Sequence, residues 1–416
     1  MKYSTPRGTR DILPDESHAL RWIQSKIAEL LTLNNYQEIQ TPIFESADLF
    51  QRAVGETTDI VEKEMYIFQD KGDRTMALRP EGTASVVRAF LQHNAIFQKR
   101  KVTKLFYQGP MFRYERPQTG RYRQFHQMGV EAIGSVSPYL DVETMMMGVD
   151  IFQKLGLQDV SLAVNSVGCE VCRPVIRERL KQFVESILSQ LCEDCQSRFD
   201  RNPLRILDCK NPTCQTYFTG LPDIQSALCH DCSDHFLSVM TLLDEHHVPH
   251  TIDAHLVRGL DYYTKTVFEI RSNVLGAQNA ICGGGRYDNL IAEMGGRKTP
   301  AFGYAIGMDR LYMVLKEIQA YLPTQPVSRF VLIGMGSKAK EKAFQTTLLL
   351  RQKGIQAEFM FKEGSVNDGL KEALAQGATF AVILGEQELE QDFYTVKHLK
   401  EKRQFTVKTV EELLVL

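Results

Sequence analysis

The sequence lacks the features that would assign it to a membrane or a secretory pathway. No apolar run among its 416 residues approaches the roughly 18 residues that a membrane-spanning helix needs. Residues 1–17 contain early acidic side chains and no apolar stretch, which fits neither a secretory signal nor an organelle-targeting peptide. We therefore expect the protein to act in the cytoplasm, where thiols stay reduced.

The chain also lacks an overall basic excess and the two common nucleotide-binding motifs. Its formal net charge is −2, whereas dedicated nucleic-acid-binding proteins usually carry a clear positive charge. It contains neither GxxxxGK(S/T) nor GxGxxG between a strand and a helix, so an ATP site would have to hold phosphates in another way. Arginines on a rigid sheet would serve, because a guanidinium is always charged and binds two phosphate oxygens at once.

Positive charge is concentrated in one stretch. A hydrophobic content of 43% and a charged content of 24% are ordinary for a globular protein of two or three domains. Between residues 98 and 123, however, the basic residues are opposed by a single acid, Glu115. They are Lys99, Arg100, Lys101, Lys104, Arg113, Arg116, Arg121 and Arg123. On charge alone, a solvated face and a nucleic-acid contact are equally good interpretations.

Hydrophobic periodicity predicts helices and strands in the first third of the chain. Residues 16–33 carry apolar side chains at helical spacing. Residues 36–44 are typical of a strand, and Pro42 should put it at an edge or an interface because proline cannot donate to a sheet. Residues 103–113 and 123–133 predict a long antiparallel hairpin with a mobile basic loop between its strands.

The C-terminal part has a different pattern, which follows a proline-bearing linker at 321–327. Strands predicted at 329–334, 355–361 and 379–384 alternate with helices at 338–353 and 366–376. Such alternation indicates a small α/β domain on a largely parallel sheet.

Residues 169–247 contain eight of the nine cysteines, and we interpret them as a module inserted between strands at 161–165 and 264–271. The pairs Cys169/Cys172 and Cys192/Cys195 are separated by 19 residues, which fits metal-ligand spacing. A second set would be Cys209 and Cys214 with Cys229 and Cys232, although any pairing is a guess. The module is predicted to hold one or two structural Zn²⁺ ions, with unliganded reduced thiols as the alternative. Cys282 stands apart and should be a small packed residue.

Polar side chains on predicted strands suggest a ligand site. Gln127, Gly129 and Glu131 project from one face of the strand at 123–133, and Glu81 and Thr83 share a face if their segment is extended. Buried polar atoms without partners are costly, so such a face is unusual for a core. The glycine would leave room for the ring of a ligand. Each residue alone is better explained as structural, and only the combination favours a site.

Three further clusters carry the same ambiguity. RGLDYY at 258–263 places a permanent cation beside two tyrosines, or is a packed turn. Residues 302–311 predict a strand that turns into a helix with Arg310 in the first turn, and their glycines allow the close approach of a ligand or another element. The glycine run at 283–285 is by itself best explained as a flexible turn.

Taken in order, these segments resemble the motifs of one enzyme family. GPMFRYERPQTGRYRQFHQMGVE at 109–131 resembles motif 2 of class II aminoacyl-tRNA synthetases in its histidine-specific form, and GYAIGMDRL at 303–311 resembles motif 3. The first helix and the Pro42 strand resemble motif 1, the dimer-forming element. LVRGLDYYT at 256–264 and CGGGRYD at 282–288 are similar to signatures of histidyl-tRNA synthetases. The resemblance runs from PRGTRDILP at 6–14 to the C-terminal domain, and five motifs in the right order make it specific.

The resemblance implies an α+β fold and a homodimer formed through the motif 1 region. A class II antiparallel β-sheet catalytic domain with helices would occupy residues 1–168 and 248–322. An inserted, mainly helical and cysteine-rich module would occupy 169–247, and an α/β anticodon-binding domain 328–416. The implied reaction converts L-histidine and ATP, with Mg²⁺, into histidyl-adenylate and diphosphate, and then transfers histidine to the 3′-terminal adenosine of tRNA(His).

The family's roles, carried to matching positions, make Arg113, Arg258 and Gln127 the catalytic residues. Arg113 would contact the α-phosphate and the histidine carboxylate, Glu115 would lie beside the adenine, and Arg310 would grip the γ-phosphate and stack on the adenine. Arg258 would take the place that many class II enzymes give to a metal ion near the α-phosphate. A fixed cation there would stabilise the charge that develops as the carboxylate attacks.

The resemblance also implies a histidine pocket. Glu81, Thr83 and Gln127 would bind the α-amino group, while Glu131 and Tyr263 would hold the two imidazole nitrogens, with Tyr262 nearby. Gly82, Arg113 and Arg258 complete the expected histidine-binding set. A site that pairs both ring nitrogens rejects apolar analogues strongly, so no editing domain is expected.

Contacts with tRNA would come from the basic loop, where Arg116, Gln118 and Arg121 would reach the acceptor stem. The family reads an extra guanosine at the tRNA 5′ end, and the C-terminal domain would bind the anticodon. Local basic residues would then explain how a chain of net charge −2 binds RNA.

Two non-synthetase alternatives share the fold. A regulatory subunit that serves histidine biosynthesis typically lacks the C-terminal domain and the RGLDYY cluster, both of which this sequence has. A module that senses uncharged tRNA usually lies within a larger kinase-bearing chain.

Overall fold

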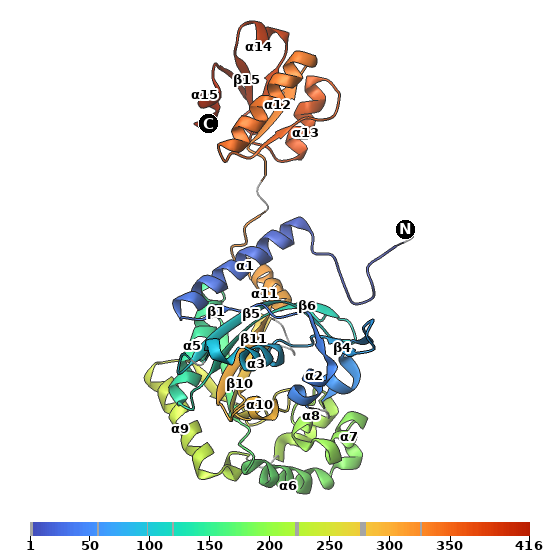
Figure 1. The fold of residues 1–416 in the computed structure, drawn as a ribbon, viewed down its shortest axis with the longest axis vertical. Coiled ribbons are helices and arrows are strands. Elements are labelled where there is room, and N and C mark those ends of the chain that lie inside the picture. The colour runs from blue at the N-terminus through green and yellow to red at the C-terminus, as the bar shows by residue number, and fades with distance from the viewer. Residues whose placement is uncertain are drawn as a thin grey trace. The chain divides into compact units, whose positions relative to one another are not determined.

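The computed structural model describes residues 3–55, 58–97, 99–118, 120–220, 224–274, 280–324 and 327–416 (Figure 1). The chain forms two compact units, residues 1–323 and 324–416. Within the described residues, no helix is both long and apolar enough to cross a lipid bilayer. The linker expected at 321–327 lies partly outside the described residues.

The N-terminal unit is built on an eight-stranded sheet of order β1-β5-β6-β11-β10-β9-β7-β8. Its strands are β1 (Gln37–Glu38), β5 (Thr103–Phe112), β6 (Gln124–Ile133), β7 (Val160–Ser166), β8 (His250–Ile252), β9 (Thr264–Ser272), β10 (Ala280–Arg286) and β11 (Ala301–Gly307). Neighbours are antiparallel except at the two edges, where β1 joins β5 and β8 joins β7 in parallel. The expected antiparallel sheet and the long hairpin predicted from strands at 103–113 and 123–133 are therefore confirmed.

Four helices bury one face of this sheet: α1 (Pro14–Leu33), α5 (Pro138–Lys154), α9 (His230–Glu245) and α11 (Met308–Glu317). The apolar positions of α1 recur every fourth residue, and Ile23, Ile27 and Leu31 are fully buried. The helix begins two residues earlier than predicted, with Pro14 at its first position, where the missing N–H costs nothing.

Shorter elements cover the opposite face. They are α2 (Ala47–Val54), the π-helical turn η1 (Ile60–Glu64), α3 (Thr83–Gln92), α4 (Asn94–Phe97), α10 (Leu290–Glu293) and a small sheet of β2 (Phe44–Ser46), β4 (Thr75–Leu78) and β3 (Ile67–Gln69). Adjacent residues of β9 enter different cores, Phe268 under the long helices and Val267 under the short elements. The alternation of strand side chains thus gives the sheet one purely structural face and one face with room for a site.

The single strand predicted at 36–44 is wrong. Residues 37–38 form the edge strand β1 of the large sheet, whereas Phe44 begins β2 of the small sheet. Pro42 lies between them, and its carbonyl accepts a bond from Arg79 Nη1 at 3.5 Å. The proline ends the extended run because it cannot donate to a ladder.

The cysteine-rich segment is helical and follows β7. It comprises α6 (Cys172–Glu185), η2 (Leu188–Gln190), α7 (Glu193–Arg201), η3 (Pro203–Ile206), α8 (Pro212–Tyr217), η4 (Phe218–Gly220), η5 (Gln225–Ala227) and then α9. Figure 1 shows α6, α7 and α8 grouped at one end of the N-terminal unit.

The C-terminal unit has a five-stranded sheet of order β13-β12-β14-β15-β16. Its elements are β12 (Phe330–Gly334), α12 (Ser337–Gln352), β13 (Ala357–Phe359), α13 (Val366–Ala375), β14 (Phe380–Leu384), α14 (Glu386–Glu390), β15 (Tyr394–His398), β16 (Arg403–Val407) and α15 (Val410–Leu414). The first three strands of the sheet are parallel, as predicted, and β15 and β16 extend it antiparallel. The fold is the expected α+β arrangement with a C-terminal α/β domain.

Candidate functional site

A pocket of about 1120 Å³ opens in the N-terminal unit. Its walls come from η1, the start of α3, strands β5, β6, β9, β10 and β11, the start of α11, the segment before β9, and the cysteine-rich segment. A concave site where side chains from distant parts of the chain converge is the usual place for a ligand.

Three arginines that lie far apart in the sequence line this pocket: Arg113, Arg258 and Arg310. Arg113 Nε donates to the carbonyl of Pro80 at 2.9 Å, and Arg310 Nη1 donates to the carbonyl of Ala280 at 3.0 Å. Burial lowers the pKa of Arg310 below its ordinary value, and the nearby charge of Arg121 lowers it further. Arginine stays charged nonetheless, so the pocket gathers like charges that an anion would stabilise.

Arg258 is held from two sides. Its Nη1 donates to Glu269 Oε1, and the other oxygen of Glu269 accepts from Arg271 Nε at 3.0 Å. Burial lowers the pKa of Arg258, but the charge of Glu269 and smaller effects of Tyr263 and Asp208 together raise it above its ordinary value. The guanidinium lies over Gly283, where a Cβ would come within 2.4 Å of Nη2. The glycine run at 283–285 is therefore part of strand β10 and accommodates Arg258, and its interpretation as a flexible turn is wrong.

Glu81 and Thr83 do not share a face of an extended segment, because Thr83 begins helix α3. Glu81 caps that helix instead, and its two oxygens accept from the backbone N–H groups of Thr83 at 2.7 Å and Ala84 at 2.8 Å. A carboxylate at a helix N-terminus pairs with amides that have no partner inside the helix. Both side chains still line the pocket.

The alternation predicted for β6 is present. Met128, Val130 and Ala132 enter the core under the long helices, so Gln127, Gly129 and Glu131 belong to the other face. The space beside Gly129 is filled by the ring of Tyr107, since a Cβ would lie 2.4 Å from its hydroxyl oxygen. A Cβ at Gly82 would lie 2.1 Å from the same ring. These glycines thus accommodate an aromatic side chain of the protein, and the expectation that Gly129 leaves room for a ligand's ring is wrong.

Glu131 is only 1% exposed and lies in a network of hydroxyl groups. Thr83 Oγ1 donates to its Oε1 at 2.7 Å, and the Tyr287 hydroxyl donates to its Oε2. Gly303 makes this placement possible, because a Cβ there would fall 2.1 Å from Oε2. Burial raises the pKa of Glu131 to about 8. Glu131 is not among the described residues that line the pocket, but Thr83, which bonds to it, is.

Tyrosines surround this carboxyl group. The rings of Tyr262 and Tyr263 lie 4.6 Å apart, Tyr287 contacts Tyr262 at 5.7 Å, and both Tyr262 and Tyr263 line the pocket. Burial raises the pKa of Tyr263 to about 12, so its hydroxyl keeps its proton at neutral pH. The Tyr263 hydroxyl can therefore both donate and accept hydrogen bonds inside the pocket.

The remaining predicted residues separate into two groups. Gln127, Glu115 and Arg121 line the pocket, and Glu115 lies 3.7 Å from Arg113 and 3.6 Å from Arg121. Gln127 Oε1 is buried and has no hydrogen-bond partner among the described residues. Arg116 and Gln118 are exposed on the loop after β5. Neither of them, nor Gly82, is among the described residues that line the pocket.

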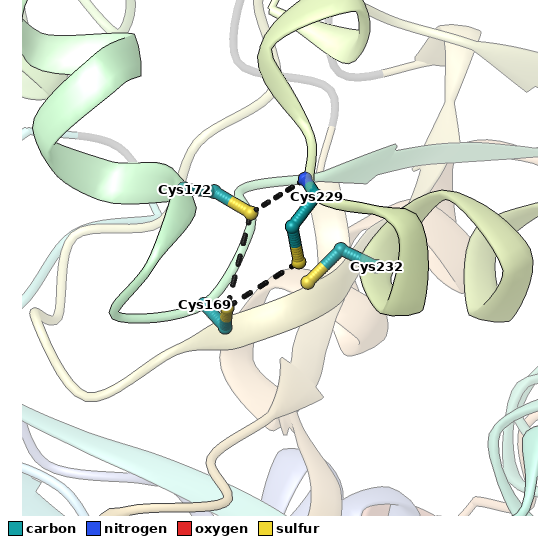
Figure 2. Close-up of side chains that lie close together, drawn as sticks. All are labelled: Cys169, Cys172, Cys229 and Cys232. Atoms are coloured by element: carbon teal, nitrogen blue, oxygen red, sulfur yellow. Dashed lines mark hydrogen bonds between the residues drawn. The ribbon is translucent and has the colours of Figure 1, made fainter.

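The eight cysteines of the helical segment form two groups of four. Cys169, Cys172, Cys229 and Cys232 converge in one group (Figure 2), and Cys192, Cys195, Cys209 and Cys214 in the other. The sets suggested by order along the chain are therefore wrong, because the first pair meets the last. Cys282 is buried in the main core, as expected for a small packed residue.

Sequence reasoning missed the residues that hold the site together. Tyr107, Glu269 and Arg271 line the pocket, yet they stand in strands without an unusual local pattern. Tyr287 lies within CGGGRYD, one of the segments that resemble the family, so its place in the site could have been proposed from the sequence.

Fold and site together define an aminoacyl-tRNA synthetase of class II, with an antiparallel sheet, converging arginines above it and a separate C-terminal α/β domain. The family model described as histidyl-tRNA synthetase matches residues 8–190 and 217–311, and the model described as anticodon binding domain matches residues 329–414.

Individual proteins agree with these matches. The histidine–tRNA ligase of Halothermothrix orenii is 48% identical over 98% of this chain and 97% of its own length. That of Desulforamulus reducens is 46% identical over 100% of this chain and 99% of its own. The crystal structure of apo histidyl-tRNA synthetase from S. aureus has a TM-score of 0.81 and 37% identity, and it covers 99% of this chain and 98% of that one. The chain belongs to the histidyl-tRNA synthetase family, which makes it an aminoacyl-tRNA ligase.

Proposed function

We propose that this chain activates L-histidine with MgATP to give histidyl-adenylate and diphosphate, and then transfers histidine to the 3′-terminal adenosine of tRNA(His). The observation that carries the proposal is the convergence of Arg113, Arg258 and Arg310 on one pocket, which Thr83, a hydrogen-bond partner of the buried Glu131, also lines. Cations at the walls suit a triphosphate, and a carboxyl group among hydroxyl groups suits an imidazole.

The proposed chemistry of the first step is an in-line attack. A histidine carboxylate oxygen attacks the α-phosphorus, and diphosphate leaves with Mg²⁺. Arg113 and Arg258 stabilise the charge on the α-phosphoryl oxygens and the carboxylate. Arg310 holds the γ-phosphate, and Glu115, which is close to Arg113, lies beside the adenine.

Histidine recognition is proposed to rest on two sets of groups. Gln127 Oε1, buried without a partner among the described residues, accepts from the α-ammonium group together with Glu81 and Thr83. Glu131 and the Tyr263 hydroxyl serve the two imidazole nitrogens, with Tyr262 beside them. An analogue without ring nitrogens would leave these buried polar groups unpaired, which is costly.

Histidine-dependent ATP–pyrophosphate exchange tests the proposal. The wild-type chain should show exchange that requires histidine, and its absence would favour a non-catalytic relative. Glu131→Ala should raise the KM for histidine at least about tenfold through loss of a buried hydrogen bond, with a small effect on the KM for ATP. Equal losses for both substrates would contradict the assigned role. Glu143→Ala, at a partly exposed carboxylate of α5, is the matched control.

Interaction with tRNA is proposed to involve both units. Arg116, Gln118 and Arg121 would contact the acceptor stem, and the C-terminal domain, residues 328–416, would contact the anticodon. Residues 1–168 and 248–322 would form the catalytic domain and residues 169–247 the inserted module.

A homodimer is proposed through the region of β2 and β3. Ile43, Phe44, Ile67 and Phe68 expose 43%, 53%, 49% and 41% of their surface there, an apolar group that a second copy would cover. Sedimentation should give the mass of about two chains for the wild type, as expected of the commonest symmetric assembly. Phe68→Asp should weaken the association, and Phe361→Asp, at an exposed phenylalanine of the C-terminal unit, should not.

We further propose that the reaction takes place in the cytoplasm and that the cysteine-rich segment holds structural Zn²⁺. None of the nine cysteines forms a disulfide bond, a state that a reducing compartment maintains. Four thiols in one place form the donor set that zinc prefers.

A further inference from the structure

The outer cluster, Cys169, Cys172, Cys229 and Cys232, has the dimensions of a zinc site. Its four sulfurs lie within 4.8 Å of one another, and Cys169 Sγ is 3.8 Å from both Cys172 Sγ and Cys229 Sγ (Figure 2). A tetrahedron with Zn–S bonds of about 2.3 Å has edges of about 3.8 Å. A disulfide would need sulfurs at about 2.05 Å, so these distances favour a shared ion.

The inner cluster, Cys192, Cys195, Cys209 and Cys214, repeats this geometry. Its sulfurs also lie within 4.8 Å of one another, and Cys192 Sγ is 3.8 Å from Cys209 Sγ. The two clusters are nested in the sequence, because both pairs of the inner set lie between the first and last pairs of the outer set.

Backbone groups around both clusters favour thiolates. The N–H of Cys229 points at Cys172 Sγ at 3.1 Å, and the N–H of Cys192 points at Cys214 Sγ at 3.2 Å. Cys229 and Cys192 are the N-cap residues of α9 and α7, whose amino ends carry partial positive charge. Such donors stabilise the negative charge of metal-bound sulfurs.

The two clusters differ in what surrounds them. Cys172 and Cys232 of the outer cluster are packed in a large core that includes Ile176, Leu256 and Val257. The inner cluster belongs to a separate small core, in which the described buried residues are Val184, Leu191, Cys195, Ile206, Cys209, Cys214 and Phe218. A core of this size, with three cysteines among seven residues, cannot fold stably by apolar burial alone.

The inner lobe, residues 186–220, forms one wall of the pocket. Asp208, Lys210 and Asn211 line it, and the N–H of Asn211 points at Cys209 Sγ at 3.4 Å. Arg205 Nη1 reaches the carbonyl of Arg258 at 3.5 Å. Whatever orders the inner lobe therefore also orders this wall.

We infer that the chain binds two structural Zn²⁺ ions, one in each set of four cysteines. The inner ion orders the wall of the pocket, and the outer ion joins the start of the cysteine-rich segment to its end. The role given to the inner ion rests on the proposed function of the pocket. The two ions themselves do not depend on that function.

Metal analysis of the full-length protein, purified without added zinc, tests the sites. The wild type should contain about two zinc ions per chain, one for each set of four thiols, and Cys282→Ala should contain the same. Replacing Cys192, Cys195, Cys209 and Cys214 together with serine should leave about one. If the cysteines paired in sequence order, the same variant would contain no zinc, because each set of four would lose two of its ligands. That result would overturn the nested pairing.

Cobalt binding to the wild type covers the case in which the serine variant fails to fold. Uptake of about two equivalents per chain, with the intense visible bands of tetrahedral cobalt thiolates, supports two four-thiol sites. A wild type with less than about 0.2 zinc per chain that also lacks these bands would overturn the inference.

The role of the inner ion is tested by proteolysis and exchange kinetics. The inner-cluster variant should be cleaved within residues 186–220 under conditions that leave the wild type intact, and its KM for ATP and histidine should rise about tenfold or more. Unchanged KM values would overturn the role while leaving the ions in place. A zinc-replete wild type without exchange activity would instead count against the proposed function.

Discussion

The guanidinium of Arg258 rests on the backbone of Gly283. A Cβ at residue 283 would come within 2.4 Å of Nη2, and the bond to Glu269 keeps the side chain from moving away. The glycine of one strand and the arginine of a preceding loop therefore form one structural unit.

Gly283→Ala should displace Arg258 and lower the kcat of histidine-dependent exchange by about 100-fold, the usual effect of losing one group that stabilises developing charge. The free energy of unfolding should fall far less than activity does. Gly72→Ala is the control, since a Cβ there meets Asp70 at an ordinary 3.4 Å. Normal kcat in the Gly283 variant would argue against a role for Arg258 in the chemical step.

Glu131 should make stability depend on pH. Its pKa is about 8 in the folded chain and that of an ordinary glutamate in the unfolded chain, so the folded state binds the proton more tightly. Its contribution is complete below the unfolded value and is lost as pH rises towards 8, by up to about 1.4 kcal/mol per pH unit. Denaturant midpoints between pH 5.5 and 7.5 should therefore fall more for the wild type than for Glu131→Gln. Glu143→Gln should behave like the wild type, and parallel curves for all three proteins would refute the prediction.

Arg286 and Asp141 form an ion pair in which neither side chain is exposed, with Arg286 Nη2 at 3.0 Å from Asp141 Oδ1. His235 Nε2 lies 2.8 Å from the other oxygen of Asp141. Arg286→Met should destabilise the N-terminal unit by about 3–5 kcal/mol, because it leaves a buried carboxylate without its main partner. Chemical denaturation measures the loss. Arg351→Met, which breaks an exposed pair with Glu358, should cost under about 1 kcal/mol.

The two units should separate by function. A chain that ends at Pro323 keeps the described pocket, so histidine-dependent exchange should stay within a few-fold of the wild type. Aminoacylation of tRNA(His) should fall by about 100-fold or more, since contacts with the RNA supply much of the affinity for it. Comparing the two assays on both proteins measures the difference, and an equal loss in both would show that the C-terminal unit supports the first step.

Features with a local physical cause could be predicted from the sequence. The helix at 16–33 and the hairpin strands at 103–113 and 123–133 have a clear period, and the structure has α1, β5 and β6 there. Arg113, Arg258 and Arg310 could be named because short motifs contain them, although only the fold brings them to one pocket.

The rest depends on contacts between distant segments. Nothing near Gly129 in the sequence tells that Tyr107 fills its space, and nothing near Glu81 tells that it caps α3. The spacing of the cysteines also did not reveal which pairs come together. The cysteine-rich segment folds back on itself, so that its first cysteine pair meets its last. The antiparallel strands β15 and β16 were not predicted, because the alternation of strands and helices up to residue 384 already described a small parallel α/β sheet.

Helix α9 limits how the cysteine-rich segment can be shortened. Phe236, Val239 and Leu243 of this helix pack in the main core, and His235 bonds to Asp141 of α5. An engineered enzyme that replaces the segment with a short connection would have to keep α9 and join the chain ahead of it. Such a connection would also have to replace Ile176, which packs in the large core, and the wall of the pocket that residues 186–220 form.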